Sequence, residues 1–213
     1  MTRSISYLLV FSFSFPLLGC TMSTSITGKG QTNALNEEGV ECLNQHQLTK
    51  AHGKFVEAWK QDPTNADTLY NLASTYHRHG QLQEAERYYL QALKTNPDHA
   101  LCRHNYYQLL VTEDRLSEAQ ADASKWVKQR PQSAIALTQL GWLTRLQGDL
   151  PTAQKQLEKS LALEPDNTET LLELGKLYQD LNLNDRAKGL YTRVLQIDPQ
   201  QKEASNLLVS MRK

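Results

Sequence analysis

The residues most suited to bind a metal ion form two groups in the middle of the chain. His77 and His79 make up the first group, and His99, Cys102 and His104 make up the second. Imidazole and thiolate are zinc ligands, and all of them must lie about 2.0 to 2.3 Å from a shared ion. A helix-forming stretch of about 13 residues separates the two groups, and at 1.5 Å per residue such a helix is about 20 Å long. We therefore predict no metal site.

Catalysis and cofactor binding have no recognisable motif in the sequence. It contains no Gly-x-Ser-x-Gly elbow, no phosphate-binding loop and no His-Glu-x-x-His pair. The acidic residues are scattered over positions expected to face solvent. The sequence therefore predicts no catalytic residue and no cofactor. The alternative is an enzyme or ligand-binding protein that uses a groove for a small molecule, which requires a closed and mostly apolar pocket.

The balance of charges argues against nucleic acid as a partner. Lys and Arg number 23, and so do Asp and Glu, so no excess of positive charge is present to displace counterions from a phosphate backbone. The apolar residues lie mostly in stretches rich in Ala, Leu, Gln, Glu and Lys, without the alternating Val, Ile and Thr of strands. This pattern predicts an all-α fold.

Residues 1–19 have the layout of an export signal peptide. Arg3 precedes an apolar stretch, residues 7–15, which is too short for a membrane span of about 20 residues. The segment ends in Leu-Leu-Gly directly before Cys20, and this ending resembles the bacterial lipobox. The resemblance implies that Cys20 becomes the first mature residue and is the site of lipidation.

The residue after the cysteine and the segment that follows predict how the protein is anchored. Thr21 stands where lipoproteins of the inner membrane have Asp, which implies the periplasmic face of the outer membrane in an organism that has one. Residues 20–33 are polar and rich in Ser, Thr and Gly, so we expect a lipidated cysteine and a flexible tether. The alternative is a signal peptide cleaved elsewhere, which leaves a soluble periplasmic protein.

A period of 34 residues runs through the rest of the chain, residues 34–213. Prolines and alanines both recur at this spacing, at Pro63, Pro97, Pro131, Pro165 and Pro199 and at Ala51, Ala85, Ala119, Ala153 and Ala187. Such a period is typical of stacked helix pairs, none of which buries its apolar face alone. With proline at position 32 of each unit, the units are residues 32–65, 66–99, 100–133, 134–167 and 168–201, followed by a capping helix over residues 202–213.

The units resemble the tetratricopeptide repeat (TPR) family. Its signature has large residues at positions 4, 7, 11 and 24, small residues at positions 8, 20 and 27, and proline at position 32. The unit 66–99 matches throughout, with Leu69, Leu72, Ala73, Tyr76, Ala85, Tyr89, Ala92 and Pro97. The resemblance implies a right-handed α-solenoid of five TPR helix pairs plus a C-terminal capping helix.

Two units depart from the signature. In the unit 100–133, Tyr107 and Trp126 occupy small positions and Ala123 occupies a large one. We interpret this as a volume-conserving exchange, because cores tolerate rearranged sizes better than changed total volume. Glu38 takes an apolar position of the first unit, which suits an N-terminal capping repeat with no unit in front of it.

The two cysteines of the repeat region are predicted to be free thiols. Cys42 and Cys102 lie two units apart, or about 20 Å if each helix layer adds 8 to 10 Å. A disulfide requires Cα atoms within about 7 Å. We expect Cys42 to be a small core residue and Cys102 to lie near the surface.

The TPR resemblance also implies a binding groove. In that family the first helix of each unit lines the concave face, chiefly through positions 2, 5, 9, 12 and 13. We expect these positions to hold a helical or extended segment of another protein. The candidate groove residues are Tyr70, Ser74, His77, His104, Gln108, Thr138, Trp142, Arg145, Leu172 and Lys176.

A lipid-anchored TPR array resembles two kinds of envelope protein. One kind comprises the pilotins and the assembly lipoproteins of type IV and Flp pili, which implies an interaction scaffold that assists a pilus or secretin complex. The other comprises anchored TPR adaptors that organise cell-wall enzymes and proteases. Both expectations come from architecture, and the sequence does not separate them.

Overall fold

The computed structural model describes residues 28–211, which form eleven helices and no strand. The helices are α1 (Gly28–Asn44), α2 (Leu48–Gln61), α3 (Ala66–Arg78), α4 (Leu82–Thr95), α5 (Ala100–Thr112), α6 (Leu116–Gln129), α7 (Ala134–Gln147), α8 (Leu150–Leu163), α9 (Thr168–Asp180), α10 (Asn184–Ile197) and α11 (Lys202–Ser210). Consecutive helices pack as five pairs, and α11 follows as a single helix. The predicted all-α solenoid is confirmed.

The 34-residue period reappears at the start of each helix pair. The residue just before α3, α5, α7, α9 and α11 accepts a hydrogen bond from a backbone N–H in the first turn; these residues are Asn65, His99, Ser133, Asn167 and Gln201. Such caps satisfy donors that the helix itself leaves unpaired. The regularly spaced proline, two residues before each cap, therefore marks the break between one pair and the next.

The turn inside each pair repeats with the same period. One residue in each turn adopts a positive φ angle: His46, Gly80, Asp114, Gly148 and Asn182. Glycine adopts this left-handed conformation freely, and Asn, Asp and His tolerate it better than other residues. The sequence thus encodes the turn within each pair as well as the break between pairs.

The two helices of a pair make their closest approach where positions 8 and 24 meet. A Cβ atom added at Gly141 would lie 2.7 Å from the Leu157 side chain, so the large residue of α8 requires glycine in α7. In the third pair the sizes are reversed, and both Tyr107 and Ala123 are fully buried. Trp126 is buried as well, at 4% exposure. The burial of all three residues supports the predicted exchange of large and small positions.

Position 3 of the repeat is a second place of close approach, which the sequence analysis did not identify. It carries a small and fully buried residue in every unit from the second onward and at the matching place of the capping helix: Thr68, Cys102, Ala136, Thr170 and Ala204. Cys102 Sγ lies 3.5 Å from the backbone oxygen of Tyr89 in the preceding pair. The prediction that Cys102 lies near the surface is therefore wrong, because position 3 faces the unit before it.

The two thiols are free, as predicted, but their environments are not those expected. Burial raises the pKa of the Cys102 thiol to about 12. Cys42, predicted to be a core residue, is only half-buried and packs at the edge of the N-terminal core.

The ends of the array differ in part from the expectation. Helix α1 begins at Gly28, so residues 28–33, which we assigned to the tether, are helical, and Thr32 is buried. Glu38 is exposed on the open face of α1 and forms an ion pair with Lys54 at 2.7 Å, as suits a capping repeat. At the other end, α11 covers the core residues of the last pair with Ala204.

The predicted signal peptide and the lipidation site at Cys20 lie outside the described residues. Within residues 28–211, each helix is too short or too polar to qualify as a membrane span.

Candidate functional site

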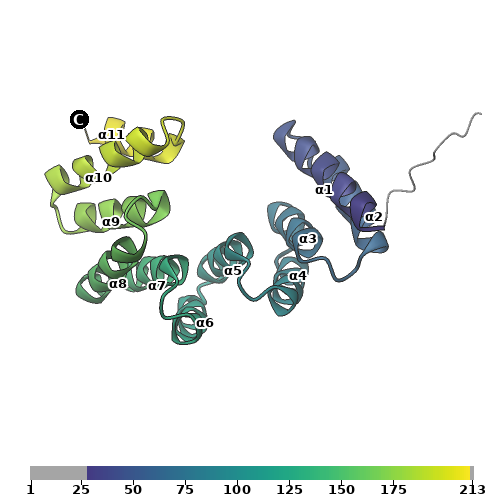
Figure 1. Cartoon of the computed structure of the whole chain (residues 1–213), viewed down its shortest axis with the longest axis horizontal. Coiled ribbons are helices and arrows are strands. Elements are labelled where there is room, and N and C mark those ends of the chain that lie inside the picture. Colours follow the sequence, from purple (N-terminus) through teal and green to yellow (C-terminus); the bar gives the residue numbers. More distant parts are fainter. Residues whose placement is uncertain (1–27, 212–213) are drawn as a thin grey trace, which may run out of the picture.

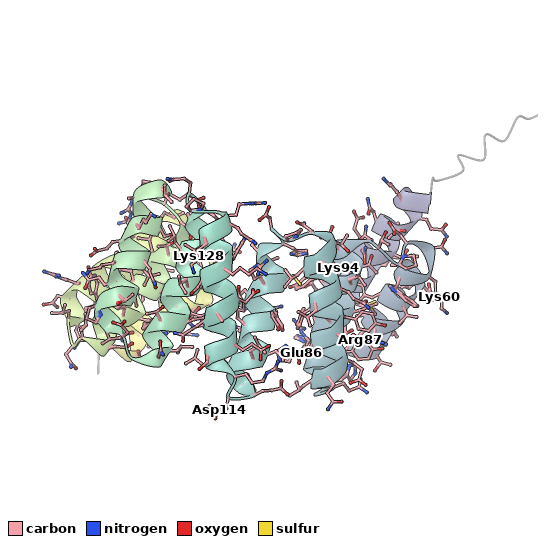
Figure 2. The ribbon with its side chains drawn as sticks, turned by 90° about the horizontal axis from the view of Figure 1, so that it is seen from below. Lys60, Glu86, Arg87, Lys94, Asp114 and Lys128 are labelled. Carbon is pink, nitrogen blue, oxygen red and sulfur yellow. The ribbon has the colours of Figure 1, made fainter. Side chains whose placement is uncertain are left out.

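The helix pairs are arranged in an arch with an inner and an outer face (Figure 1). Helices α3, α5 and α7 lie on the inner side, whereas α4, α6 and α8 lie on the outer side. The outer face bears many charged side chains, among them exposed Lys94 on α4 and Lys128 on α6 (Figure 2). The inner face contains the cavities described below.

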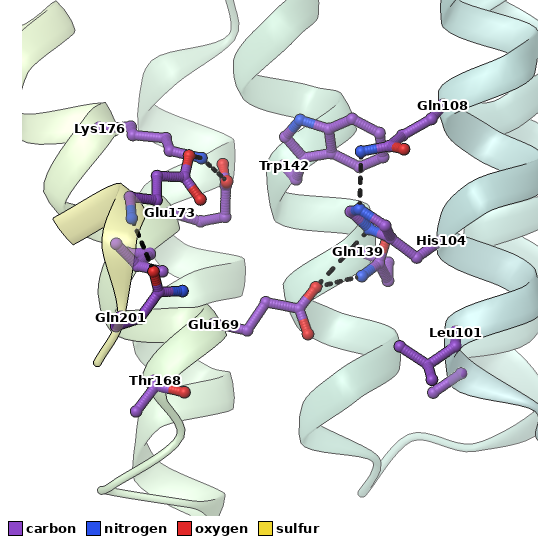
Figure 3. Close-up of a pocket in the computed structure, with 13 residues that line it drawn as sticks. Leu101, His104, Gln108, Gln139, Trp142, Thr168, Glu169, Glu173, Lys176 and Gln201 are labelled. Carbon is purple, nitrogen blue, oxygen red and sulfur yellow. Dashed lines mark hydrogen bonds and ion pairs between the residues drawn. The ribbon is translucent and has the colours of Figure 1, made fainter. Parts of the chain in front are cut away.

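A cavity of about 340 Å³ opens on the inner face between α5, α7, α9 and the start of α11 (Figure 3). Most of the residues that line it are polar or charged, although their apolar parts contribute much of the surface. The lining residues are Ala100, Leu101, His104, Gln108, Gln139, Trp142, Thr168, Glu169, Leu172, Glu173, Lys176, Gln201 and Glu203. Four helices from three successive units and the capping helix therefore contribute to one site.

A chain of hydrogen bonds crosses the cavity from α5 to α9 (Figure 3). Gln108 Nε2 donates to His104 Nε2 at 2.9 Å, so His104 carries its proton on Nδ1, which lies 3.0 Å from Gln139 Oε1. Gln139 Nε2 in turn donates to Glu169 Oε1 at 2.5 Å. Burial raises the pKa of Glu169. The chain fixes the position of a carboxylate that is partly desolvated and that makes no ion pair with a Lys or Arg among the described residues.

A network of ion pairs forms the far wall of the cavity. Lys176 Nζ lies 2.7 Å from Glu173 Oε1 and 2.6 Å from Glu203 Oε1, which joins α9 to α11. Burial lowers the pKa of Lys176, but these two carboxylates outweigh it and raise the pKa overall. Arg145 lies behind this wall, 3.4 Å from Glu173 and 2.8 Å from Asp180.

Trp142 forms an aromatic platform on the inner face of α7. Its ring is half-buried, and the ring centroid lies 5.1 Å from that of His104. The indole packs against the core cluster on one side and lines the cavity on the other. Tryptophan in such a position offers a large rigid surface to a ligand at a low cost in side-chain entropy.

The structure brings together half of the candidate groove residues in this cavity: His104, Gln108, Trp142, Leu172 and Lys176. A second hollow, between α3 and α5, is lined by Ser74 and His77 and again by Gln108. Tyr70 lies in neither hollow but accepts a hydrogen bond from Asn105 at 3.2 Å.

Two candidates have roles inside the fold. The prediction is wrong for Thr138, which is 1% exposed and whose hydroxyl lies 2.8 Å from that of Ser160 and 2.7 Å from that of Thr170. Arg145 is held by Glu173 and Asp180, with only 13% of its side chain exposed, and does not line the cavity. Position in the repeat does not reveal such local pairing.

The sequence analysis missed several residues of the cavity. Leu101, Glu169 and Glu203 occupy position 2 of their units, which the family pattern assigns to the concave face, so that signal was present. Gln139 and Glu173 occupy position 6, for which the pattern gave no signal.

The histidines considered as metal ligands are engaged in other contacts. His79 Nδ1 lies 2.9 Å from the Thr75 carbonyl oxygen, and His99 caps α5 by accepting from the Cys102 N–H. Within residues 28–211, no three His, Cys, Asp or Glu side chains come together in a way that could hold an ion.

Comparison with family models finds tetratricopeptide repeats at residues 66–99 and at residues 145–210. These matches show that the chain contains tetratricopeptide repeats, and its five helix pairs have the arrangement of such repeats. Repeat proteins of this kind present extended concave surfaces for protein interaction. No curated protein sequence matches the chain.

Several solved structures share the fold. TTC0263, a thermophilic TPR protein of Thermus thermophilus, superposes with a TM-score of 0.71 at 21% identity, covering 84% of this chain and 98% of that one. PilF of Pseudomonas aeruginosa has a TM-score of 0.63 at 21% identity, covering 83% of this chain and 81% of that one. PilW, a type IV pilus biogenesis factor, has a TM-score of 0.61 at 23% identity, covering 78% of this chain and 76% of that one.

Proposed function

We propose that the protein is a lipid-anchored adaptor of the bacterial envelope that holds a segment of another protein in its concave cavity. The observation that carries the proposal is the cavity itself, in which Trp142 forms one wall and hydrogen-bonding groups of three units form the others. Protein-binding surfaces combine aromatic anchors with such polar groups. Small-molecule sites bury most of the surface of their ligand, whereas this cavity opens along the concave face across three units, which favours a protein segment as the occupant.

We further propose that the partner belongs to a pilus or secretin complex. Two of the structures that share the fold, PilF and PilW, are named for pili, and PilW is described as a type IV pilus biogenesis factor. The lipobox-like sequence before Cys20 supports a location at the membrane where such complexes assemble.

Replacing Cys20 by Ser tests the anchor. The lipobox resemblance implies that the thiol of Cys20 carries a diacylglyceryl group, and a serine hydroxyl does not replace it. We expect Cys20→Ser to abolish metabolic labelling with a fatty-acid precursor and to release the protein from membranes into the soluble fraction. Cys42→Ser is the matched control and should leave both properties unchanged. Lipid labelling that persists in Cys20→Ser would contradict the anchor.

Replacing Trp142 by Ala tests the groove. Truncation of a central aromatic anchor costs about 2 kcal/mol, which is roughly a thirty-fold loss of affinity for the partner captured from solubilised envelopes. Arg145 is unsuited to this test. Its removal would take away the guanidinium next to the buried carboxylate of Glu173, which would change the stability of the fold as well as the groove. The control is Leu90→Ala, which removes an exposed apolar side chain from outer helix α4. If Trp142→Ala keeps its helicity and melting temperature and captures every partner at unchanged affinity, the cavity is not the binding site.

A further inference from the structure

Negative charge accumulates around the cavity. Glu169, Glu173 and Glu203 line it, and Lys176 is the cationic side chain among them. Arg145 adds a second cation behind the wall, but it is shared with the further carboxylate of Asp180. Four carboxylates therefore face two cations, whereas the whole chain has equal numbers of acidic and basic residues.

Glu169 is the carboxylate that the protein leaves without a permanent cation. Its partners are the Gln139 amide at 2.5 Å and His104 Nδ1 at 3.7 Å. Within residues 28–211, no Lys or Arg lies within ion-pair distance of it. The side chain is 46% exposed and points into the cavity (Figure 3). A charge that is held in place and left without a counter-charge is available to a ligand.

Glu173 supplies a second, independent observation. The residue is 7% exposed, and its Oε2 atom is buried with no hydrogen-bond donor among the described residues. Lys176 pairs with the other oxygen, Oε1, whereas Arg145 Nη2 lies 3.4 Å from Oε2 and is too distant or too poorly aligned for a hydrogen bond. Buried carboxylate oxygens normally accept at least one hydrogen bond, so the negative charge of Glu173 at the cavity wall is incompletely satisfied by its neighbours.

The neighbouring apolar groups suit the stem of a long basic side chain. The Trp142 face lies beside the His104 to Glu169 chain, and a cation over a tryptophan ring is attracted to it. Leu101 is 63% exposed at the rim of the cavity, where it offers a contact for an aliphatic residue. Arginine and lysine both join an apolar stem to a charged head.

We infer that the occupant of the cavity is a basic segment of the partner protein, which places an Arg or Lys side chain against Glu169 and Trp142 and an adjacent aliphatic residue against Leu101. This inference rests on the proposed function and names the chemistry of its ligand. A segment rich in Asp or Glu is excluded by the same charges.

Selection from a random peptide display library tests the inference on the purified full-length chain. The wild type should enrich peptides in which Arg or Lys stands beside an aliphatic residue, well above their frequency in the library. Enriched peptides, synthesised and measured by fluorescence anisotropy, should bind Glu169→Gln about ten-fold more weakly. Glu158→Gln, which removes one exposed negative charge from outer helix α8, should bind them as the wild type does.

A charge reversal makes the test independent of stability. Glu169→Lys should lose the basic peptides and enrich acidic ones, which a variant that merely unfolds cannot do. The inference is overturned if the enriched peptides have no excess of Arg or Lys, or if they bind Glu169→Gln unchanged. In that event, loss of binding in Trp142→Ala would leave the proposed function standing. If no peptide is enriched, or if Trp142→Ala binds the enriched peptides as well as the wild type, the proposed function fails too.

Discussion

Tyr107→Ala is expected to lower the free energy of unfolding by about 3 to 5 kcal/mol, the range for truncation of a buried aromatic side chain. Tyr107 is fully buried, and its hydroxyl donates to Asp122 Oδ2 at 2.8 Å. Ala123→Tyr alone should also destabilise, by about 1 to 3 kcal/mol, because the space opposite Ala123 is already filled. Urea unfolding followed by circular dichroism measures both effects.

The double variant Tyr107→Ala plus Ala123→Tyr distinguishes an exchange of sizes from two unrelated buried residues. It recreates the arrangement of the preceding pair, in which Ala73 and Tyr89 are both fully buried. We expect it to be more stable than Tyr107→Ala alone, since the large side chain returns to the shared space from the other helix. If the two destabilisations simply add, positions 8 and 24 of this pair do not share one space.

Asp122→Ala is expected to lower the free energy of unfolding by about 3 kcal/mol, because it leaves the charge of Arg103 buried and unpaired. The Arg103 side chain is 8% exposed, and Nη1 lies 2.5 Å from Asp122 Oδ2. The guanidinium also donates to the Pro97 carbonyl oxygen at 2.7 Å and lies 4.5 Å from the centroid of the Trp126 ring. This one side chain therefore ties α5 to α6 and to the turn before them.

Arg103→Met should cost less than Asp122→Ala, because Asp122 is 39% exposed and water can solvate it once Arg103 is gone. The exposed pair of Arg193 and Asp166, at 2.9 Å, is the control, and Asp166→Ala should change stability by less than about 1 kcal/mol. Equal losses for Asp122→Ala and Asp166→Ala, measured by urea unfolding, would contradict the buried ion pair.

The helix pairs could be predicted from sequence because two requirements of the repeat place the same type of residue at a fixed spacing. Proline marks the break between pairs, and small residues mark close approach. The left-handed residue of each turn follows the same period, but it is glycine in only two of the five turns. In the other turns it is His46, Asp114 or Asn182, so no single residue type marks the position. A type of residue is visible in a sequence, whereas a shared backbone conformation is not.

The cavity could be predicted only in part, because it depends on how side chains pair locally. Trp142 and Lys176 occupy positions that the family pattern assigns to the groove, and both line the cavity. Thr138 occupies such a position too, yet its hydroxyl is drawn into hydrogen bonds with Ser160 and Thr170. Position 5 is therefore buried in this unit. Whether the residue at this position is buried or lines the groove depends on the side chains around it.

Site-specific photo-crosslinking tests most directly whether the concave face is the binding surface. A photoreactive amino acid is placed in cells at Leu101, on the cavity rim, or at Lys128, on the outer face (Figure 2). We expect a discrete crosslinked partner from position 101, weakened when Trp142→Ala is added, and none from position 128. The same partner crosslinked from position 128 but not from position 101 would contradict the account and place binding on the convex face.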